Sequence, residues 1–223
     1  MEEPKDICSI RYLDKKAIVI HNQKYIMDKK TIDTYNALAK EYDAETSDFW
    51  DRFPRTIIDT FCNLTQGRVL DVGSGPGRDG SILHKAGLHV VCLDASEVMV
   101  KLSFARGLES VVGDFNEMPF PDESFDGVWA YTSLLHVPRA EVMKPLREIR
   151  RVLKIGGTFG LGLIEGDGEL YRESSGVGKP RWFSFYKKEE VEYLITQNGF
   201  EIVYFEEFMP NTKNYLNFIS KKI

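Results

Sequence analysis

The chain has 223 residues, and its 29 basic and 34 acidic side chains give a formal net charge of −5. The hydrophobic share of 43% excludes an intrinsically disordered chain. No apolar run approaches the roughly 20 residues of a transmembrane helix, so no membrane partner is expected. The acidic balance argues against nucleic-acid binding, which needs a basic face. The densest basic stretch, 147–154, has helical periodicity and is interpreted as a solvated helix face.

The cysteines and the N-terminus indicate a cytoplasmic protein. Cys8, Cys62 and Cys92 are widely scattered and form no C-x-x-C pair, which argues against a disulfide framework and against a zinc site. Reduced thiols are typical of the cytosol. The first residues are charged and contain no apolar segment of the signal-peptide type. We therefore expect no bound metal and no secretion signal.

The first part of the chain is expected to form an extension and two helices. Residues 1–30 are interpreted as an N-terminal extension, in which two β-rich runs within 7–27 predict a β-hairpin. From residue 31 apolar and aromatic side chains recur every three or four positions, which predicts a helix over 31–46. The same pattern predicts a second helix over about 48–64.

From residue 68 onward, short apolar strands alternate with helical segments. This alternation predicts a parallel sheet covered by helices on both faces, a doubly wound α/β fold. The expected strands are 68–72, 89–94, 110–114, 125–131 and 157–164, followed by two closing strands at 201–208 and 215–222. The expected helices are 77–86, 96–106, one kinked or two separate helices over 138–154, and 187–200. Gly199 is expected at the C′ position of the last of these helices.

A glycine-rich turn, LDVGSGPGRDG at residues 70–80, follows the first of these strands. Gly75, Gly77 and Gly80 have the G-x-G-x-x-G spacing of a dinucleotide-binding turn. In such a sheet ligands bind beyond the carboxyl ends of the strands, where Asp94 and Asp114 end the next two strands. A carboxylate there is able to accept hydrogen bonds from both hydroxyls of a ribose, and NAD fits these features.

The acid before the glycines separates two kinds of ligand. Asp71 lies two residues before Gly73 and would repel the pyrophosphate of a dinucleotide. The same carboxylate would attract a ligand that carries an ammonium and a sulfonium. S-adenosylmethionine (SAM) has both groups, together with a ribose and an adenine. The turn after Asp114 offers a place for that adenine, and a nicotinamide enzyme gives it no obvious role.

Four segments in order now resemble known motifs: VLDVGSGPGRDG, VVCLDASEVMV, GDFNEMPFPDESFDGVWAYTSLLHV and LREIRRVLKIGGTFGLG. They are similar to motifs of the class I SAM-dependent methyltransferases, in the small-molecule branch that includes quinone-biosynthesis enzymes. The resemblance covers about residues 31–222. It implies a methyltransferase domain over 31–223, with a Rossmann-like, mostly parallel sheet of seven strands whose last strand, 215–222, is antiparallel. Ser74 stands where the family usually has a cysteine.

The resemblance also implies which residues bind SAM, with S-adenosylhomocysteine (SAH) as the product. Gly73, Gly75 and Gly77 would cradle its methionine part, Asp94 would bind the ribose, and Asp114 with Phe115 would hold the adenine. The helix over 31–46 would close over SAM with its tyrosines, although an amphipathic face explains their spacing equally well. The expected cofactor-binding set is Asp71, Gly73, Ser74, Gly75, Gly77, Asp94, Ala95, Asp114, Phe115, Tyr131, Tyr35 and Tyr42.

Two further segments are candidates for acceptor binding. After the strand at 125–131 come Ser133 and His136; His136 is either a general base or a packing side chain that caps the next helix. The long connection 165–186 is either a lid that grips the substrate or a solvated loop over a core edge. The expected acceptor-binding residues are Ser133, Glu165, Arg181, Phe183 and Tyr186.

The favoured function is SAM-dependent methyl transfer to an O, N or C nucleophile of a small-molecule acceptor by a monomer or homodimer. Methylation of tRNA or protein is an alternative that requires a basic patch beside the pocket. A regulatory SAM-binding module without turnover is another, and it requires no adjoining acceptor cavity. A nicotinamide enzyme is the weakest of the four.

Overall fold

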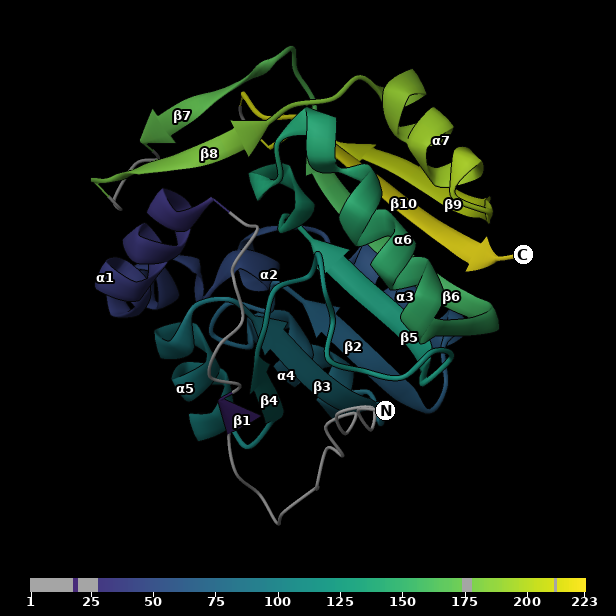
Figure 1. The fold of residues 1–223 in the computed structure, drawn as a ribbon, viewed down its shortest axis with the longest axis horizontal. Coiled ribbons are helices and arrows are strands. Elements are labelled where there is room, and N and C mark those ends of the chain that lie inside the picture. Colours follow the sequence, from purple (N-terminus) through teal and green to yellow (C-terminus); the bar gives the residue numbers. More distant parts are fainter. Residues whose placement is uncertain (1–17, 20–27, 174–177, 211) are drawn as a thin grey trace, which may run out of the picture.

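The structure is a computed structural model that describes residues 18–19, 28–173, 178–210 and 212–223. Its described residues form one large sheet of eight strands with helices packed around it (Figure 1). In spatial order the strands are β1 (Ile18–Val19), β4 (Glu109–Val112), β3 (His89–Asp94), β2 (Arg68–Val72), β5 (Phe125–Tyr131), β6 (Leu153–Ile164), β10 (Tyr215–Lys222) and β9 (Phe200–Phe208).

The pairing confirms the predicted doubly wound sheet. The described strand pairs from β1 to β6 are parallel, and β10 runs antiparallel to both β6 and β9. The chain order reverses between β2 and β5, so the carboxyl ends of these two strands form a topological switch point, where such sheets bind ligands. Strand β1 extends the predicted seven strands at the β4 edge. Apart from β1, the predicted hairpin over 7–27 lies outside the described residues.

Several predicted boundaries are wrong. Strand β6 begins at Leu153, four residues before the predicted strand 157–164, and the helical segment predicted over 138–154 ends at Val152. Strand β4 ends at Val112, so Asp114 lies in the following loop and does not end the strand. The helix predicted over 48–64 is two helices, because Phe53 precedes Pro54 and adopts an extended conformation with φ −126° and ψ 152°. A residue before proline is driven away from helical geometry by steric clash with the proline ring.

The helices observed are α1 (Lys29–Thr46), α2 (Phe49–Arg52), α3 (Thr56–Leu64), α4 (Arg78–Lys85), α5 (Glu97–Ala105), α6 (Met143–Val152) and α7 (Lys188–Gln197). The segment 138–154 resolves into a 3₁₀ turn, Arg139–Glu141, followed by α6. Gly199 follows α7 with φ +73°, as its predicted position past the helix end requires. Helix α6 lies in front of the sheet and α3 behind it (Figure 1).

The connection 165–186 contains a two-stranded antiparallel hairpin, β7 (Glu169–Glu173) and β8 (Pro180–Ser184). The hairpin lies beside α1 at one end of the molecule (Figure 1). Thr34 Oγ1 donates to the Pro180 carbonyl at 3.0 Å, and the Trp182 N–H donates to Thr31 Oγ1 at 2.9 Å. The insertion is therefore attached to α1 along β8, which a solvated loop would not be.

Small residues in β6 make room for large rings in β5. Trp129 pairs with Gly160 and Tyr131 with Gly162, and a Cβ atom at either glycine would lie 2.4 Å from the facing ring. The rings of Trp129 and Tyr131 stack with centroids 5.5 Å apart. The G-x-G spacing in this strand therefore fixes where two aromatic side chains of the sheet lie.

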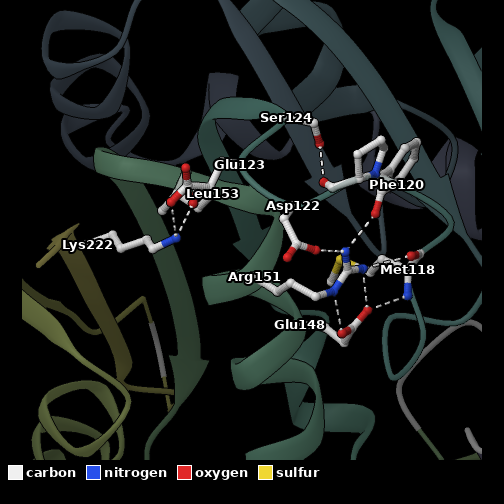
Figure 2. A network of polar contacts seen from close by, with 10 residues as sticks. Met118, Phe120, Asp122, Glu123, Ser124, Glu148, Arg151, Leu153 and Lys222 are labelled. Atoms are coloured by element: carbon white, nitrogen blue, oxygen red, sulfur yellow. Dashed lines mark hydrogen bonds and ion pairs between the residues drawn. The ribbon is translucent and has the colours of Figure 1, made fainter.

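Arg151 of α6 holds the loop between β4 and β5 (Figure 2). Its guanidinium donates to the carbonyls of Met118 and Phe120 and to the carboxylates of Asp122 and Glu148, at 2.7 to 3.0 Å. These partners keep the loop that begins at Asp114 against the body of the domain.

We expect Arg151→Met to lower the free energy of unfolding by about 1–2 kcal/mol, because several charge-assisted hydrogen bonds are lost. Arg147→Met is the matched control, since Arg147 is an exposed arginine of the same helix. Chemical denaturation of both variants measures the effect. Equal stability of the two variants would contradict the role given to Arg151.

Candidate active site

A cavity lies at the switch point, between the carboxyl ends of β2, β3 and β5 and the side chains of α1. It encloses about 730 Å³ of empty space, open solvent at its mouth included. Twelve of the residues expected to bind cofactor or acceptor line it: Tyr35, Tyr42, Asp71, Gly73, Ser74, Gly75, Asp94, Ala95, Phe115, Tyr131, Ser133 and His136. The cavity therefore gathers residues that are far apart in the sequence, such as Tyr35 and His136, which are separated by 101 positions.

The glycine turn after β2 is bound to the end of β3. The N–H groups of Gly73 and Ser74 donate to the Leu93 carbonyl, and the Gly75 N–H donates to Asp94 Oδ2 at 2.8 Å. Gly73 has φ +67°, and a Cβ atom on it would lie 2.4 Å from Cβ of Ser133. Only glycine fits this backbone conformation and this close approach.

Two expected cofactor residues do not line the cavity. Gly77 precedes α4 with φ +83°, and its missing side chain leaves room for Ser103 and Leu108. Asp114 is buried and accepts hydrogen bonds from the N–H and the side-chain amide of Asn116, both at 2.8 Å. The position of Gly77 indicates a role in helix packing, and that of Asp114 a role in loop structure. Phe115, the residue after Asp114, lines the cavity.

Three buried or half-buried carboxylates line the cavity: Asp71, Asp79 and Asp94. Burial, with the nearby charge of Asp79, holds the pKa of Asp71 well above its ordinary value. Among the described residues Asp71 Oδ2 has no hydrogen-bond partner. Burial also raises the pKa of Asp94 to about 6. The N–H groups of Ser96 and Gly75 stabilise its ionised form and oppose this rise. A cationic or hydroxyl-rich ligand would satisfy these groups.

Sequence reasoning missed Arg78 and Asp79, which follow the glycine turn and line the cavity. Asp79 accepts hydrogen bonds from Trp50 Nε1 at 2.7 Å, Trp129 Nε1 at 3.0 Å and Arg78 Nε at 2.7 Å. An acid in the first turn of α4 was visible in the sequence. Its two indole partners come from distant elements, and no local pattern indicates them.

Side chains of α1 form part of the cavity wall. The ring of Tyr42 is 3.9 Å from where a Gly75 Cβ would lie, and it meets the Tyr35 ring edge-on at 5.3 Å. Asn36 anchors the helix, since its Oδ1 accepts a hydrogen bond from Ser96 Oγ at 2.7 Å. Both tyrosines therefore line the cavity, and Tyr42 lies against the glycine turn.

His136 lies in a chain of hydrogen bonds that joins α1 to the hairpin. Its Nδ1 is 2.5 Å from the Trp182 carbonyl, which only accepts, so we assign the proton to Nδ1. Nε2 then accepts from the Tyr35 hydroxyl at 2.8 Å, and Tyr35 accepts from Arg181 Nη1 at 2.6 Å. Burial, with the charge of Arg181, lowers the pKa of His136 to about 3. This arrangement favours a packing role for His136. A role as general base stays a prediction.

A second cavity continues outward from the first, and the two share Tyr35, Tyr42, Thr46, Arg78, Thr132 and His136. Arg181 and Phe183 of the hairpin line it, as expected for acceptor-binding residues. Thr132, at the junction, has φ +54°, a strained conformation for a β-branched residue.

Glu165 and Tyr186 line neither cavity. They pair with each other through a β-bridge, and Glu165 accepts a hydrogen bond from Asn214 Nδ2 at 3.1 Å. Tyr186 is buried, and the guanidinium of Arg139 lies over its ring. They support the base of the hairpin in this structure, and acceptor contact by either residue stays a prediction.

The fold and the site together define a doubly wound α/β protein with a ligand site of the nucleotide-binding type at its switch point. Residues 70–161 match the family model described as a methyltransferase domain. Sterol 24-C-methyltransferase ERG6B of Gibberella zeae is 43% identical over 103 residues, which is 42% of this chain and 27% of the relative. Demethylmenaquinone methyltransferase of Renibacterium salmoninarum is 38% identical over 108 residues, 48% of this chain and 45% of the relative.

Uncharacterized protein MJ1123 of Methanocaldococcus jannaschii is 30% identical over 144 residues, 62% of this chain and 67% of the relative. A solved SAM-dependent methyltransferase of Methanosarcina mazei has the same fold, with a TM-score of 0.67 and 21% identity over 77% of this chain and 98% of that one. The chain belongs to the class I SAM-dependent methyltransferase family. It spans 26% to 57% of the length of the first curated relatives that it matches.

Within the described residues, none of the helices combines the length and the apolar character needed to cross a membrane.

The buried His136 predicts a specific loss of stability in acid. The unfolded state takes up a proton near pH 6.5, whereas the folded state does so only near pH 3, so stability falls as pH falls between these values. From pH 6.5 to 5 this amounts to about 2 kcal/mol. We expect His136→Gln to show less acid destabilisation than the wild type by that amount in urea denaturation. His84→Gln, at an exposed histidine, serves as the control; an unchanged pH dependence in His136→Gln would refute the assignment.

Proposed function

We propose that this protein transfers the methyl group of SAM to an O, N or C nucleophile of a small-molecule acceptor. The observation that carries the proposal is the carboxylate-lined cavity at the switch point, with the buried Oδ2 of Asp71 unpartnered among the described residues. SAM has the ammonium, the sulfonium and the ribose hydroxyls that such groups bind. A dinucleotide would bring its pyrophosphate to the same carboxylates, which repel it.

Different residues of the lining suit different chemical groups of SAM. The ionised carboxylate of Asp94 accepts hydrogen bonds from hydroxyls, as a ribose requires. Asp71 suits an ammonium group, and Arg78 is the cation of the lining that suits a carboxylate. Phe115 and Met99 offer apolar contact to an adenine.

When bound, SAM supplies an electrophilic methyl group whose leaving group is a neutral thioether. The chain has to align a nucleophile with that methyl and exclude water, and positioning of this kind contributes up to about 7–11 kcal/mol in ideal cases. Tyr35 and Tyr42 cover the cavity, and the chain Arg181–Tyr35–His136 fixes α1 against the hairpin. These contacts hold one closed arrangement around the junction of the two cavities.

The second cavity supports catalysis over a purely regulatory role, because it gives an acceptor room beside the cofactor cavity. The relatives named for sterol and demethylmenaquinone methylation support a small-molecule acceptor. A cytoplasmic location, a monomeric or homodimeric state and the absence of nucleic-acid partners are parts of the same proposal.

The proposal predicts that SAM and SAH bind and that NADH does not. Asp94→Asn should weaken SAH binding by about 2 kcal/mol, roughly 30-fold, because a desolvated, charged hydrogen-bond acceptor is lost. Glu97→Gln is the control, since Glu97 is an exposed carboxylate at the start of the next helix. Isothermal titration calorimetry measures all three ligands on the three proteins. NADH binding without SAH binding would overturn the proposed function.

The raised pKa of Asp94 predicts that SAH binding releases a proton in mild acid. Below pH 6 the free protein holds a proton on Asp94, whereas ribose hydroxyls favour the ionised form. Affinity should therefore fall up to about tenfold per pH unit below pH 6 and level off above about pH 7. Calorimetry in two buffers of different ionisation enthalpy counts the protons. The release near pH 6 should disappear in Asp94→Asn, and its persistence there would assign it to another group.

A further inference from the structure

Cationic side chains outnumber acidic ones around the second cavity. Its lining contains Arg52, Arg78, Arg181 and Lys213, against the single carboxylate of Glu45. The first cavity has the opposite character, with three aspartates and one arginine in its lining. The two connected cavities therefore suit ligands of opposite charge.

Arg78 and Arg52 of this lining form ion pairs with carboxylates. Arg78 Nε lies 2.7 Å from Asp79, and Arg52 lies 3.0 Å from Asp48. Lys213 forms no ion pair with any carboxylate of the described residues. It is only partly exposed, and burial, followed by repulsion from Arg172 and Arg181, lowers its pKa. Lys213 and Arg181 belong to the lining of the same cavity. A half-buried ammonium without a carboxylate partner lowers the stability of the protein unless an anion joins it.

Arg181 is a fixed cation on the hairpin side of the same cavity. Its residue is 5% exposed, and its guanidinium lies 5.0 Å from the ring centre of Tyr35 and 5.3 Å from that of Phe183. One of its nitrogens, Nη1, donates to the Tyr35 hydroxyl. The rings and this bond hold the guanidinium in place, and a positioned guanidinium recognises carboxylate and phosphate groups well.

The rest of the second cavity is apolar and aromatic. Phe49, Phe53, Leu135, Ile164 and Tyr215 line it. Phe49 packs edge-on against Phe53 and Tyr215, with ring centroids 4.8 and 6.2 Å apart. Such a surface receives a flat or hydrophobic body and offers little to a purely polar ligand.

We propose, on the basis of the proposed function, that the methyl acceptor is a small organic anion. Its carboxylate or phosphate group is held by Lys213 and Arg181, and its apolar body lies on the aromatic lining. Its nucleophile then points through the junction at Thr132 and His136 toward the cofactor cavity. The recognition of the anion is separate from the carboxylates that hold the cofactor.

The burial of Arg181 favours a small anion over tRNA. Arg181 is almost completely buried, and it lines a cavity together with aromatic side chains. A nucleic acid binds through exposed basic side chains that follow its backbone. A phosphate-bearing macromolecule is therefore an outcome that the test has to distinguish.

The test uses matched pairs of small probes on the SAH-loaded full chain: benzoate against benzamide, and phenyl phosphate against phenol. We expect at least one anion to bind at least tenfold more tightly than its neutral counterpart by calorimetry. Lys213→Met should remove most of that preference while leaving the affinity for the neutral probe unchanged. The same variant should melt no lower than the wild type, because it removes a repelled charge. A purely structural role for Lys213 predicts a lower melting temperature instead.

Lys179→Met is the matched control, since Lys179 is an exposed lysine near the start of β8 that does not line the second cavity. It should keep the wild-type preference for the anion. Equal binding of the anions and neutral probes, or binding of none of them, overturns the proposal, as does binding of tRNA at the Lys213 site with no small anion bound. SAH binding is measured first and separately, so failure of the proposed function is distinguished from failure of this inference.

Discussion

The site depends on a simple electrostatic constraint, which is that carboxylates removed from water need donors or cations around them. Asp79 meets this need with two indole N–H groups and the Arg78 guanidinium. Asp94 meets it in part with the N–H groups of Gly75 and Ser96. Asp71 keeps an oxygen without a partner among the described residues, and burial together with the charge of Asp79 raises its pKa. The domain therefore holds a carboxylate-rich, incompletely satisfied edge that a cationic nucleoside would complete.

Helix α1 and the β7–β8 hairpin serve different cavities. Helix α1 contributes tyrosines to the cofactor cavity, and the β7–β8 hairpin contributes Arg181 and Phe183 to the outer cavity. The hydrogen bonds through Tyr35 and His136 join these two elements directly. Both cavities share Tyr35 and His136. We therefore expect a ligand in one cavity to change the affinity for a ligand in the other through these side chains.

Most of the sheet could be predicted from the sequence, because apolar strands and amphipathic helices leave strong periodic patterns. The strands 68–72, 89–94, 125–131 and 215–222 have the predicted bounds. The glycine turn and the acids of β2 and β3 also follow from local spacing. Contacts that join distant segments leave no such pattern. Nothing local indicates that Asp79 receives two tryptophans, that Tyr35 bonds His136, or that residues 169–184 form a hairpin against α1.

A crystal structure of the SAH complex tests the roles of Asp94 and Asp71 most directly. We predict that SAH lies in the cavity at the switch point, with its ribose hydroxyls bonded to Asp94 and its ammonium on the side of Asp71. The outer cavity beside Lys213 should remain open to an acceptor. SAH bound elsewhere, or bound with its ribose away from Asp94, would contradict the assignment of the site.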